Sequence, residues 1–471
     1  MKRMKRTILY IVCGIALASM LDSCHIYRKY HRPEVETDGL FRDTASVSGT
    51  IADGDSLSIG DVAWTEIFTD PLLQELIRRG LEKNSNLQSA LLQAEAAQAS
   101  FRAAQLAFLP SLTLAPQGTV SSFDGSKASW TYNVPVAASW EIDLFGRLMN
   151  SKRNAKAALM QSKAYAQAVR TQIIAAIANG YYTLLMLDRQ LAITEETAAI
   201  WQQSVETMRA LKEGGMTNEA AVAQSEANSR MIAASIPALR RQIRETENSL
   251  SLLLYQVPQS IERGTFESQS LPEILRVGVP VQMLANRPDV QAAEMSLASA
   301  YYSTNIARSA LYPNLVISGS AGWTNSAGSF IVNPGKILLS ALASLTQPIF
   351  NRGSNLARLK AAKAQQEIAA INFQQTLLNA GKEVSDALYQ YQSYKEALAQ
   401  RHLQVAALHN AVDYTESLMN LGTSTYLEVL TARQSLLSAQ LSEISDSYQS
   451  MIAVVNLYRA LGGGRETEPK K

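Results

Sequence analysis

Two long stretches of the chain place apolar residues at alternating steps of three and four, the spacing by which one helix packs along another. The first runs from Arg147 to about Lys212, contains no proline, and is rich in Ala, Gln, Leu and Ile, which favour helix. Its apolar seam breaks once, where Ala176, Gly180 and Leu184 are spaced by four and four, a stutter that locally unwinds a left-handed supercoil. A helix of this length extends about 100 Å, so it must lie along other helices of similar length.

The second long helix is expected from residue 352 to about 420, and each long helix leads into a turn and a return helix. The turns contain Gly214-Gly215 and Gly422, because glycine allows the positive φ that reverses the chain in few residues. The return helices are expected at residues 216–255 and 424–461. The apolar seam of the second long helix comprises Leu377, Ala380, Val384, Ala387, Tyr391, Tyr394 and Leu398.

The hydrophobic period changes to two over residues 110–143 and 313–349, which predicts a strand hairpin in each region. Trp130 and Trp140 lie ten residues apart on one face of the first hairpin. At a strand tilt of 40° they are roughly 25 Å apart in height, which is the height of the apolar band of an outer-membrane barrel. Trp323, in the second hairpin, is assigned with them to an aromatic girdle at the membrane. The alternative is a soluble hairpin buried in a sandwich, because alternation is a weak signal for one strand.

The two halves of the chain repeat one another. Pro110 matches Pro313, an offset of 203 residues (313 − 110), and Gly215 matches Gly422, an offset of 207 residues (422 − 215). A period this long indicates a duplicated module of helix, hairpin, long helix, turn and return helix. The predicted domains are a signal peptide at 1–23, a lipidated arm at 24–62, a first repeat at 63–256, an equatorial connector at 257–283, a second repeat at 284–461 and a disordered tail at 462–471.

The first 23 residues form a targeting segment, because a basic start precedes an apolar run, Thr7 to Leu21, that is too short to span a membrane. This run ends in Leu21-Asp22-Ser23-Cys24, which is similar to the bacterial lipobox, in which the cysteine is acylated and becomes the new N-terminus. Three acyl chains on Cys24 would anchor the protein stably to a membrane. Asp22 is unusual in a lipobox, and the alternative is an ordinary secretory signal with a chance cysteine.

The composition excludes several classes of protein. Cys13 and Cys24 are the only cysteines, which excludes a disulfide framework and a cysteine-based metal site. The net charge is +2 with no block of like charge, so no nucleic-acid partner is expected. The sequence contains no nucleophile elbow, phosphate loop or zinc motif, so we expect no enzyme, no metal and no cofactor beyond the covalent lipid on Cys24. Lone carboxylates such as Asp188 and Glu206 are interpreted as charges on a helix surface.

The number of predicted strands has a consequence for assembly. Four strands cannot close a barrel, and lipid does not tolerate open sheet edges. The chain must therefore oligomerise, with each copy giving four strands to a shared barrel and its helices to a shared tube. The expected fold class is mainly α with a membrane β-barrel, built from a long antiparallel coiled coil and four barrel strands per protomer.

Three stretches carry a resemblance to a known family: Val279 to Glu294, which contains Asn286-Arg287-Pro288-Asp289; Trp140 to Arg147; and Trp64 to Pro71, where Asp70 caps a helix opened by Pro71. With these motifs the chain resembles the TolC-like outer membrane factor family, in its lipoprotein branch, over nearly all of the mature chain. The resemblance implies a homotrimer in which a twelve-stranded outer-membrane barrel continues into a twelve-helix periplasmic tunnel, with a mixed equatorial domain around its middle.

The resemblance also implies a functional end, the periplasmic tip formed by the two helix-to-helix turns, where relatives meet the helical hairpins of an adaptor. Carboxylates form the gate there, at positions that match Glu428 and Thr431, so a trimer of this chain keeps one ring of acids and lacks the other. One acidic ring still concentrates cations. The alternatives are that the turns are plain loops and that Glu428 is a solvated acid favoured at a helix start. The matching tip residues are Gly214, Gly215, Met216, Thr217, Gly422, Thr423, Ser424 and Thr425.

The function implied is a passive exit duct of a tripartite efflux system, lipid-anchored in the bacterial outer membrane and extending into the periplasm. Its partners would be outer-membrane lipid, a periplasmic adaptor, also called a membrane fusion protein, and, indirectly, an inner-membrane transporter of the resistance–nodulation–division type. The expected cargo is drugs, toxic small molecules or metal ions. The alternatives are a type I protein secretion channel and a structural envelope-spanning coiled-coil lipoprotein; the nearly uncharged hairpins argue against the second.

Overall fold

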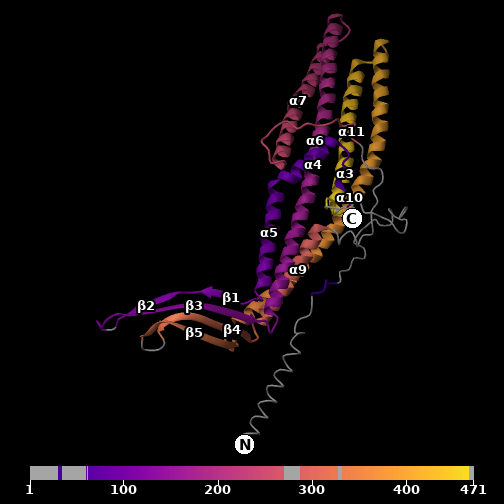
Figure 1. Ribbon diagram of the computed structural model, residues 1–471. Helices are drawn as coiled ribbons and strands as arrows, with labels where there is room; N and C mark the ends of the chain where they lie inside the picture. The colour runs from indigo at the N-terminus through magenta and orange to yellow at the C-terminus, as the bar shows by residue number, and fades with distance from the viewer. Residues whose placement is uncertain are drawn as a thin grey trace. The chain divides into compact units, whose positions relative to one another are not determined.

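The computed structural model describes residues 30–33, 60, 62–122, 124–269, 287–326 and 331–465 (Figure 1). The chain divides into two compact units. Unit 1 comprises Met1–Val35, Leu92–Lys163 and Gln291–Gln375, and unit 2 comprises Glu36–Leu91, Ala164–Val290 and Thr376–Lys471. The signal peptide, Cys24 and the tail beyond residue 465 lie outside the described residues, so the lipid anchor stays a prediction.

Unit 1 contains an antiparallel sheet in which both short strands, β1 (Ser111–Leu114) and β2 (Gln117–Ser121), pair with β3 (Ser129–Ile142). Ser111 lies opposite Ser139 and Gln117 opposite Asn133, which is one continuous register. β1 and β2 are therefore a single strand interrupted at Ala115-Pro116, where proline has no N–H to donate. With β4 (Asn314–Ser326) and β5 (Ile331–Thr346), the sheet is four strands wide.

The pairing of β3 with β4 joins the two halves of the chain. Pro135 lies opposite Gly322, and a Cβ atom on Gly322 would meet the Pro135 Cα at 2.5 Å, so only glycine fits at this crossing. Within the described residues, the β1/β2 strand and β5 each pair on one side only, which leaves both edges of the sheet open. Large apolar side chains remain exposed on it, including Leu112 at 73% and Leu339 at 74%. No second sheet covers this one in the part of the chain that the structure describes, unlike in a soluble sandwich.

The core of unit 2 forms where short helices pack on the middle of α6 (Arg147–Glu213). α4 (Pro71–Lys83) begins after Asp70, whose carboxylate accepts a hydrogen bond from the Leu72 amide at 2.8 Å, as the Asp-Pro pattern predicts. Leu73 and Ile77 of α4 are fully buried against the α6 segment that includes Ile177. α3 (Trp64–Ile67) contributes the buried Ile67 to the same cluster.

The stutter in the α6 seam coincides with this core. A Cβ atom on Gly180 would lie 2.7 Å from a methyl group of Leu250, so the absence of a side chain lets α7 (Glu219–Leu253) approach α6 closely. Farther along α6, Trp201, Val205 and Met208 continue the spacing of four and three residues and are buried. The described helices include none that is both long and apolar enough to cross a membrane.

The internal repeat is regular in the structure. α6 and α10 (Ser354–Asn420) both have 67 residues, and α7 and α11 (Tyr426–Ala460) both have 35, with an offset of 207 residues at every boundary. α5 (Ser85–Leu106) and α9 (Pro288–Ser309) both have 22 residues, with an offset of 203. The four additional residues of the second half therefore lie between the end of α9 and the start of α10.

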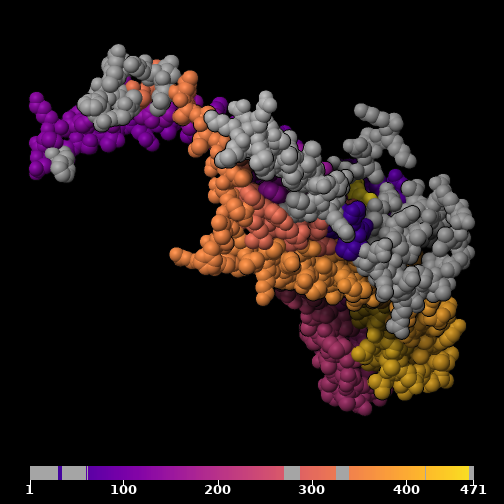
Figure 2. All heavy atoms as spheres, turned by 90° about the horizontal axis from the view of Figure 1, so that it is seen from below, coloured from indigo at the N-terminus to yellow at the C-terminus, as the bar shows by residue number. Residues whose placement is uncertain are grey.

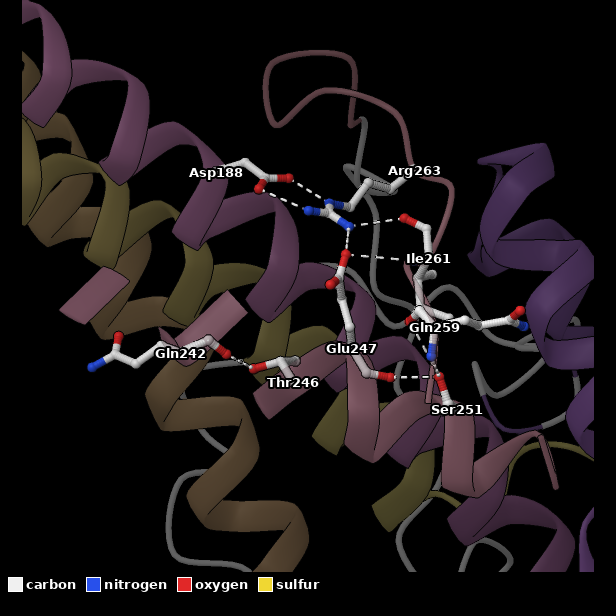
Figure 3. A network of polar contacts seen from close by, with 8 residues as sticks. All are labelled: Asp188, Gln242, Thr246, Glu247, Ser251, Gln259, Ile261 and Arg263. Carbon is white, nitrogen blue, oxygen red and sulfur yellow. Dashed lines mark hydrogen bonds and ion pairs between the residues drawn. The ribbon is translucent and has the colours of Figure 1, made fainter. Parts of the chain in front are cut away.

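The described part of the connector is tied to the first helical hairpin by an arginine (Figure 3). Arg263 donates to both carboxylate oxygens of Asp188 on α6, at 2.5 and 2.9 Å, and to Glu247 on α7 at 2.6 Å. The interpretation of Asp188 as a lone surface charge was wrong, because it pairs with Arg263. The two residues are 75 apart in the sequence, so no local pattern reveals the pair. The side chains of Arg263 and Glu247 are only 16% and 15% exposed, which strengthens their attraction.

A second buried arginine, from the Asn-Arg-Pro-Asp motif, joins three segments of unit 2. Arg287 donates to Asp289 at 2.6 and 3.0 Å, to Glu383 on α10 at 2.7 Å and to the backbone carbonyl of Ala460 at 2.8 Å. The Ala460 carbonyl lies at the end of α11, where backbone acceptors lack helical donors. This motif therefore fixes the start of α9 against the middle of α10 and the C-terminal end of α11.

Candidate functional site

The first tip turn closes α6 with a Schellman motif. The Met216 amide donates to the Leu211 carbonyl at 2.8 Å and the Gly215 amide to the Lys212 carbonyl at 2.9 Å, while Gly215 has a φ of +74°. Asn218 then caps α7 by accepting from the Ala221 amide at 3.0 Å. The Met216 side chain is 78% exposed and projects an apolar group from the turn.

The second tip turn has the same backbone, shifted by 207 residues. The Thr423 amide donates to Leu418 at 3.0 Å, the Gly422 amide donates to Met419 at 2.9 Å, and Gly422 again has a φ of +74°. Thr425 occupies the N-cap of α11 and is exposed, as is Thr423. Glycine is required in both turns because a side chain is strained at this φ.

Glu428 lies at the third position of α11 and completes a capping box. Its carboxylate accepts from the Thr425 amide at 2.9 Å and from the Ser424 hydroxyl. The hydrogen bond from Ser424 and then the one from Thr425 lower the pKa of this carboxyl group. The Thr-x-x-Glu spacing before an apolar run is the sequence signal of this cap.

Glu428 and Thr431 share the exposed face of α11, opposite the buried Val429 and Leu430. The Thr431 hydroxyl donates to the Leu427 carbonyl at 2.8 Å within the helix. Both predicted gate residues are thus solvent-accessible in the protomer, one helical turn apart. Their role as a gate stays a prediction, and the capping of Glu428 fits the alternative of a helix-start acid equally well.

The structure brings the two tip turns together. A groove of about 170 Å³ is lined by Met208, Thr217, Ala221 and Gln224 from the first hairpin and by Thr425, Tyr426, Leu427 and Leu430 from the second. In Figure 2 the rose and yellow atoms of the two helical hairpins lie against each other in unit 2. Residues of both turns therefore form one composite surface.

A small core supports this surface from below. Trp201 of α6, Ile232 of α7 and Leu430 of α11 bury one another. Next to them, Arg433 donates to Glu416 of α10 at 2.8 Å and to the Ser204 hydroxyl of α6 at 2.7 Å. Arg433 has no local signal in the sequence, because its partners lie on two other helices.

The three predicted girdle tryptophans lie on one face of the sheet in unit 1. Val134 of β3 lies opposite Trp323 of β4, and directly paired residues point to the same side, which is also the side of Trp130 and Trp140. All three are exposed, at 67%, 42% and 52% for Trp130, Trp140 and Trp323. The register puts Trp323 four residues, about 13 Å along the strand, from the level of Trp130. Trp323 is therefore not level with either end of the proposed band.

The described residues contain no group of three or more His, Cys, Asp or Glu side chains that could hold a metal ion.

An open-edged sheet with exposed apolar side chains, together with a long coiled coil that ends in two matched turns, defines a protomer of the outer-membrane channel class.

Comparison with known proteins identifies the family. Residues 76–254 and 279–463 match the outer membrane efflux protein family, to which this chain belongs. The cation efflux system protein CusC of Escherichia coli strain K12 is 28% identical over 453 residues, which cover 96% of this chain and 98% of CusC. The probable outer membrane lipoprotein SilC of Salmonella typhimurium is 28% identical over 411 residues, covering 86% of this chain and 89% of SilC.

A solved structure agrees with the fold. The open state of the MtrE outer membrane channel of Neisseria gonorrhoeae aligns with a TM-score of 0.84 at 26% identity, covering 94% of this chain and 98% of that one. These matches confirm the predicted family and the predicted fold class, in which a mainly helical chain contributes strands to a membrane barrel. The roles of the individual tip, gate and girdle residues stay predictions.

Proposed function

We propose that this chain is the outer-membrane exit duct of a tripartite efflux system that exports drugs, toxic small molecules or metal ions. Three copies would close one barrel of twelve strands, and the tip would dock with a periplasmic adaptor, which links the duct to an inner-membrane transporter of the resistance–nodulation–division type. Relatives named for cation efflux, toluene efflux and antibiotic efflux support this range of cargo.

The observation that carries the proposal is the four-stranded sheet with two open edges and exposed apolar side chains. Lipid requires every backbone hydrogen-bonding group to be satisfied, so these edges must pair with the edges of other copies. A structural spacer between membranes would need the coiled coil and no such sheet. The sheet therefore favours a duct over the spacer hypothesis.

The duct would be passive. The sequence contains no phosphate loop and no nucleophile elbow, so the energy for transport would come from the inner-membrane transporter. We also propose that no cofactor is needed other than the lipid on Cys24, which would hold the protomer in the outer membrane. The relative named as an outer membrane lipoprotein supports this anchor.

A photo-crosslinker at Thr423 tests the docking at the tip in living cells, with the captured protein identified by mass spectrometry. Thr423 is exposed beside the composite groove, so we expect capture of a periplasmic adaptor. Ala238, exposed on α7 about 30 Å from the tip, serves as the matched control and should capture much less of it. An adaptor belonging to a type I secretion system would instead support the secretion alternative.

Conductance of the purified oligomer in a planar bilayer separates a duct from a spacer. We expect discrete channels, which open more readily when the tip is loosened by Arg433→Ala, because this change removes the contacts to Glu416 and Ser204. An oligomer that is stable without detergent and conducts no ions would overturn the proposal.

A further inference from the structure

Four residues of the N-terminal arm, Tyr30 to Pro33, lie against α9 and α10 within unit 1. The Tyr30 ring contacts the Tyr301 ring edge-on, with centroids 5.8 Å apart. The Arg32 Nε lies 3.6 Å from a carboxylate oxygen of Glu294, and the guanidinium carbon lies 5.5 Å from the centre of the Phe373 ring. Two side chains of the arm thus contact three side chains of the helical body.

The receiving surface is built into the helices. Glu294 and Tyr301 are seven residues apart on α9, so they lie on one face of the helix, two turns from each other. Phe373 of α10 is 1% exposed, and the Glu294 side chain is 17% exposed. A guanidinium that lies over an aromatic ring and beside a partly buried carboxylate gains from both attractions, which water screens only in part.

Tyr30 is half-buried, whereas Arg32 is exposed. Burial first, and the charge of Glu294 second, raise the pKa of its hydroxyl to about 12, so the group stays neutral. This hydroxyl is buried without a hydrogen-bond partner among the described residues. The ring packing, rather than the hydroxyl, therefore supplies the attraction of Tyr30.

The arm contacts α9 about two turns before the end of the helix that leads into β4. Tyr30 contacts the C-terminal half of α9 and Arg32 contacts the helix two turns earlier, so residues 30–32 run antiparallel to α9. Only about 12 Å of helix separates Tyr301 from the end of α9 at Ser309. Cys24 precedes Tyr30 by six residues, and six extended residues span at most about 20 Å.

We propose that Tyr30 and Arg32 form a clip that docks the N-terminal arm onto α9 and α10. With the arm clipped, a lipid on Cys24 can reach only a membrane surface within about 20 Å of this site, so the clip sets the height at which the anchor holds the protein. The second statement rests on the proposed lipid anchor, and the docking itself does not. The clip is a positioning contact and has no part in conduction.

The rate of trypsin cleavage in the arm measures whether the arm is docked. The sequence Arg28-Lys29-Tyr30 offers a cleavable bond after Lys29, whereas the bond after Arg32 resists trypsin because Pro33 follows. A protease must draw the residues after the scissile bond into its own cleft, so a docked Tyr30 and Arg32 slow the cleavage. The assay follows the cut after Lys29 by mass spectrometry, on the full chain in outer-membrane preparations.

Glu294→Arg should accelerate this cut about tenfold, since it replaces attraction by repulsion at a partly buried site. Tyr301→Ala should accelerate it similarly, and neither change touches the cleaved sequence. The double variant Arg32→Glu/Glu294→Arg should return cleavage toward the wild-type rate. Glu367→Arg, the same charge change at an exposed position of α10, is the matched control and should leave the rate unchanged.

Wild-type cleavage rates in both Glu294→Arg and Tyr301→Ala would overturn the clip, provided that both variants keep the wild-type helix signal. A double variant that is cut as fast as Glu294→Arg alone would overturn the ion pair as the attraction. Because cleavage of the arm is measured and transport is not, failure of the clip and failure of the proposed duct give separate results.

Discussion

Replacing Arg287 by methionine should destabilise unit 2 strongly for a single substitution. The arginine side chain is 6% exposed and makes hydrogen bonds to Asp289, Glu383 and the Ala460 carbonyl. Methionine keeps most of the apolar volume but donates no hydrogen bond. The change therefore isolates the polar role of Arg287 from its packing.

The exposure of each partner sets the magnitude. Loss of the donor to the buried Ala460 carbonyl costs about 1–3 kcal/mol. The side chains of Asp289 and Glu383 are 44% and 43% exposed, so water replaces the arginine and each contributes at most about 1 kcal/mol. These contributions sum to about 1–5 kcal/mol, centred near about 3 kcal/mol.

Thermal unfolding followed by helical circular dichroism in detergent measures this loss. For a cooperative unit of about 280 residues, an unfolding entropy of about 2.1 cal/mol/K per residue converts this loss into a Tm lower by about 2–9 °C. Burial alone would raise the pKa of Asp289, but the hydrogen bonds and charge of Arg287 outweigh it and lower the pKa. This part of the stabilisation is present above the unfolded pKa and is lost as the pH falls below about 4.

The matched control is Arg189→Met, which removes an arginine that is 43% exposed and pairs with Glu267. It should lower the free energy of unfolding by less than about 1 kcal/mol. If Arg287→Met lowers Tm no more than Arg189→Met, the contacts of Arg287 do not stabilise the fold and the reasoning is refuted. A difference between the two that does not shrink toward pH 3 would refute the electrostatic part alone.

Three further predictions concern the seam, the turns and the gate. Gly180→Ala should lower the free energy of unfolding by about 1–2 kcal/mol, because its Cβ meets Leu250 at 2.7 Å; a Tm that rises, as for an ordinary helical Gly→Ala, would contradict the close packing. Gly422→Ala should cost about 1 kcal/mol through its φ of +74° alone, since nothing lies within 4 Å; an unchanged Tm in thermal unfolding would show that the turn relaxes. Thr431→Asp adds a second acid one turn from Glu428, so divalent cations should reduce the single-channel conductance more strongly than in the wild type; equal sensitivity of both would contradict the gate assignment.

Much of the fold is encoded locally and was therefore predictable. The heptad seam reports which face of α6 is buried, and Trp201 and Met208 lie on that face and are buried. Asp70 before Pro71 is a local signal for a helix start, and Gly215 and Gly422 are local signals for a chain reversal. These signals act over a few residues, so no tertiary information is needed to recognise them.

The candidate site was predictable only in part. The sequence located both turns and placed Glu428 and Thr431 on α11, but it did not indicate that the turns share a groove. It also missed Arg433, whose partner Ser204 is 229 residues away. With a single sequence, nothing marks two polar residues on different helices as neighbours.

The sequence alone determined the period of each segment, the capping residues and the duplication, because hydrophobic spacing and glycine geometry act within a few turns. The tertiary structure decided which charges are paired. In the sequence, Asp188 cannot be distinguished from other surface acids, and only the fold pairs it with Arg263 of the connector. Arg287 likewise meets its partners only where α9, α10 and α11 come together. An ion pair gains its energy from proximity and low dielectric, and both arise only once distant segments of the chain are packed together.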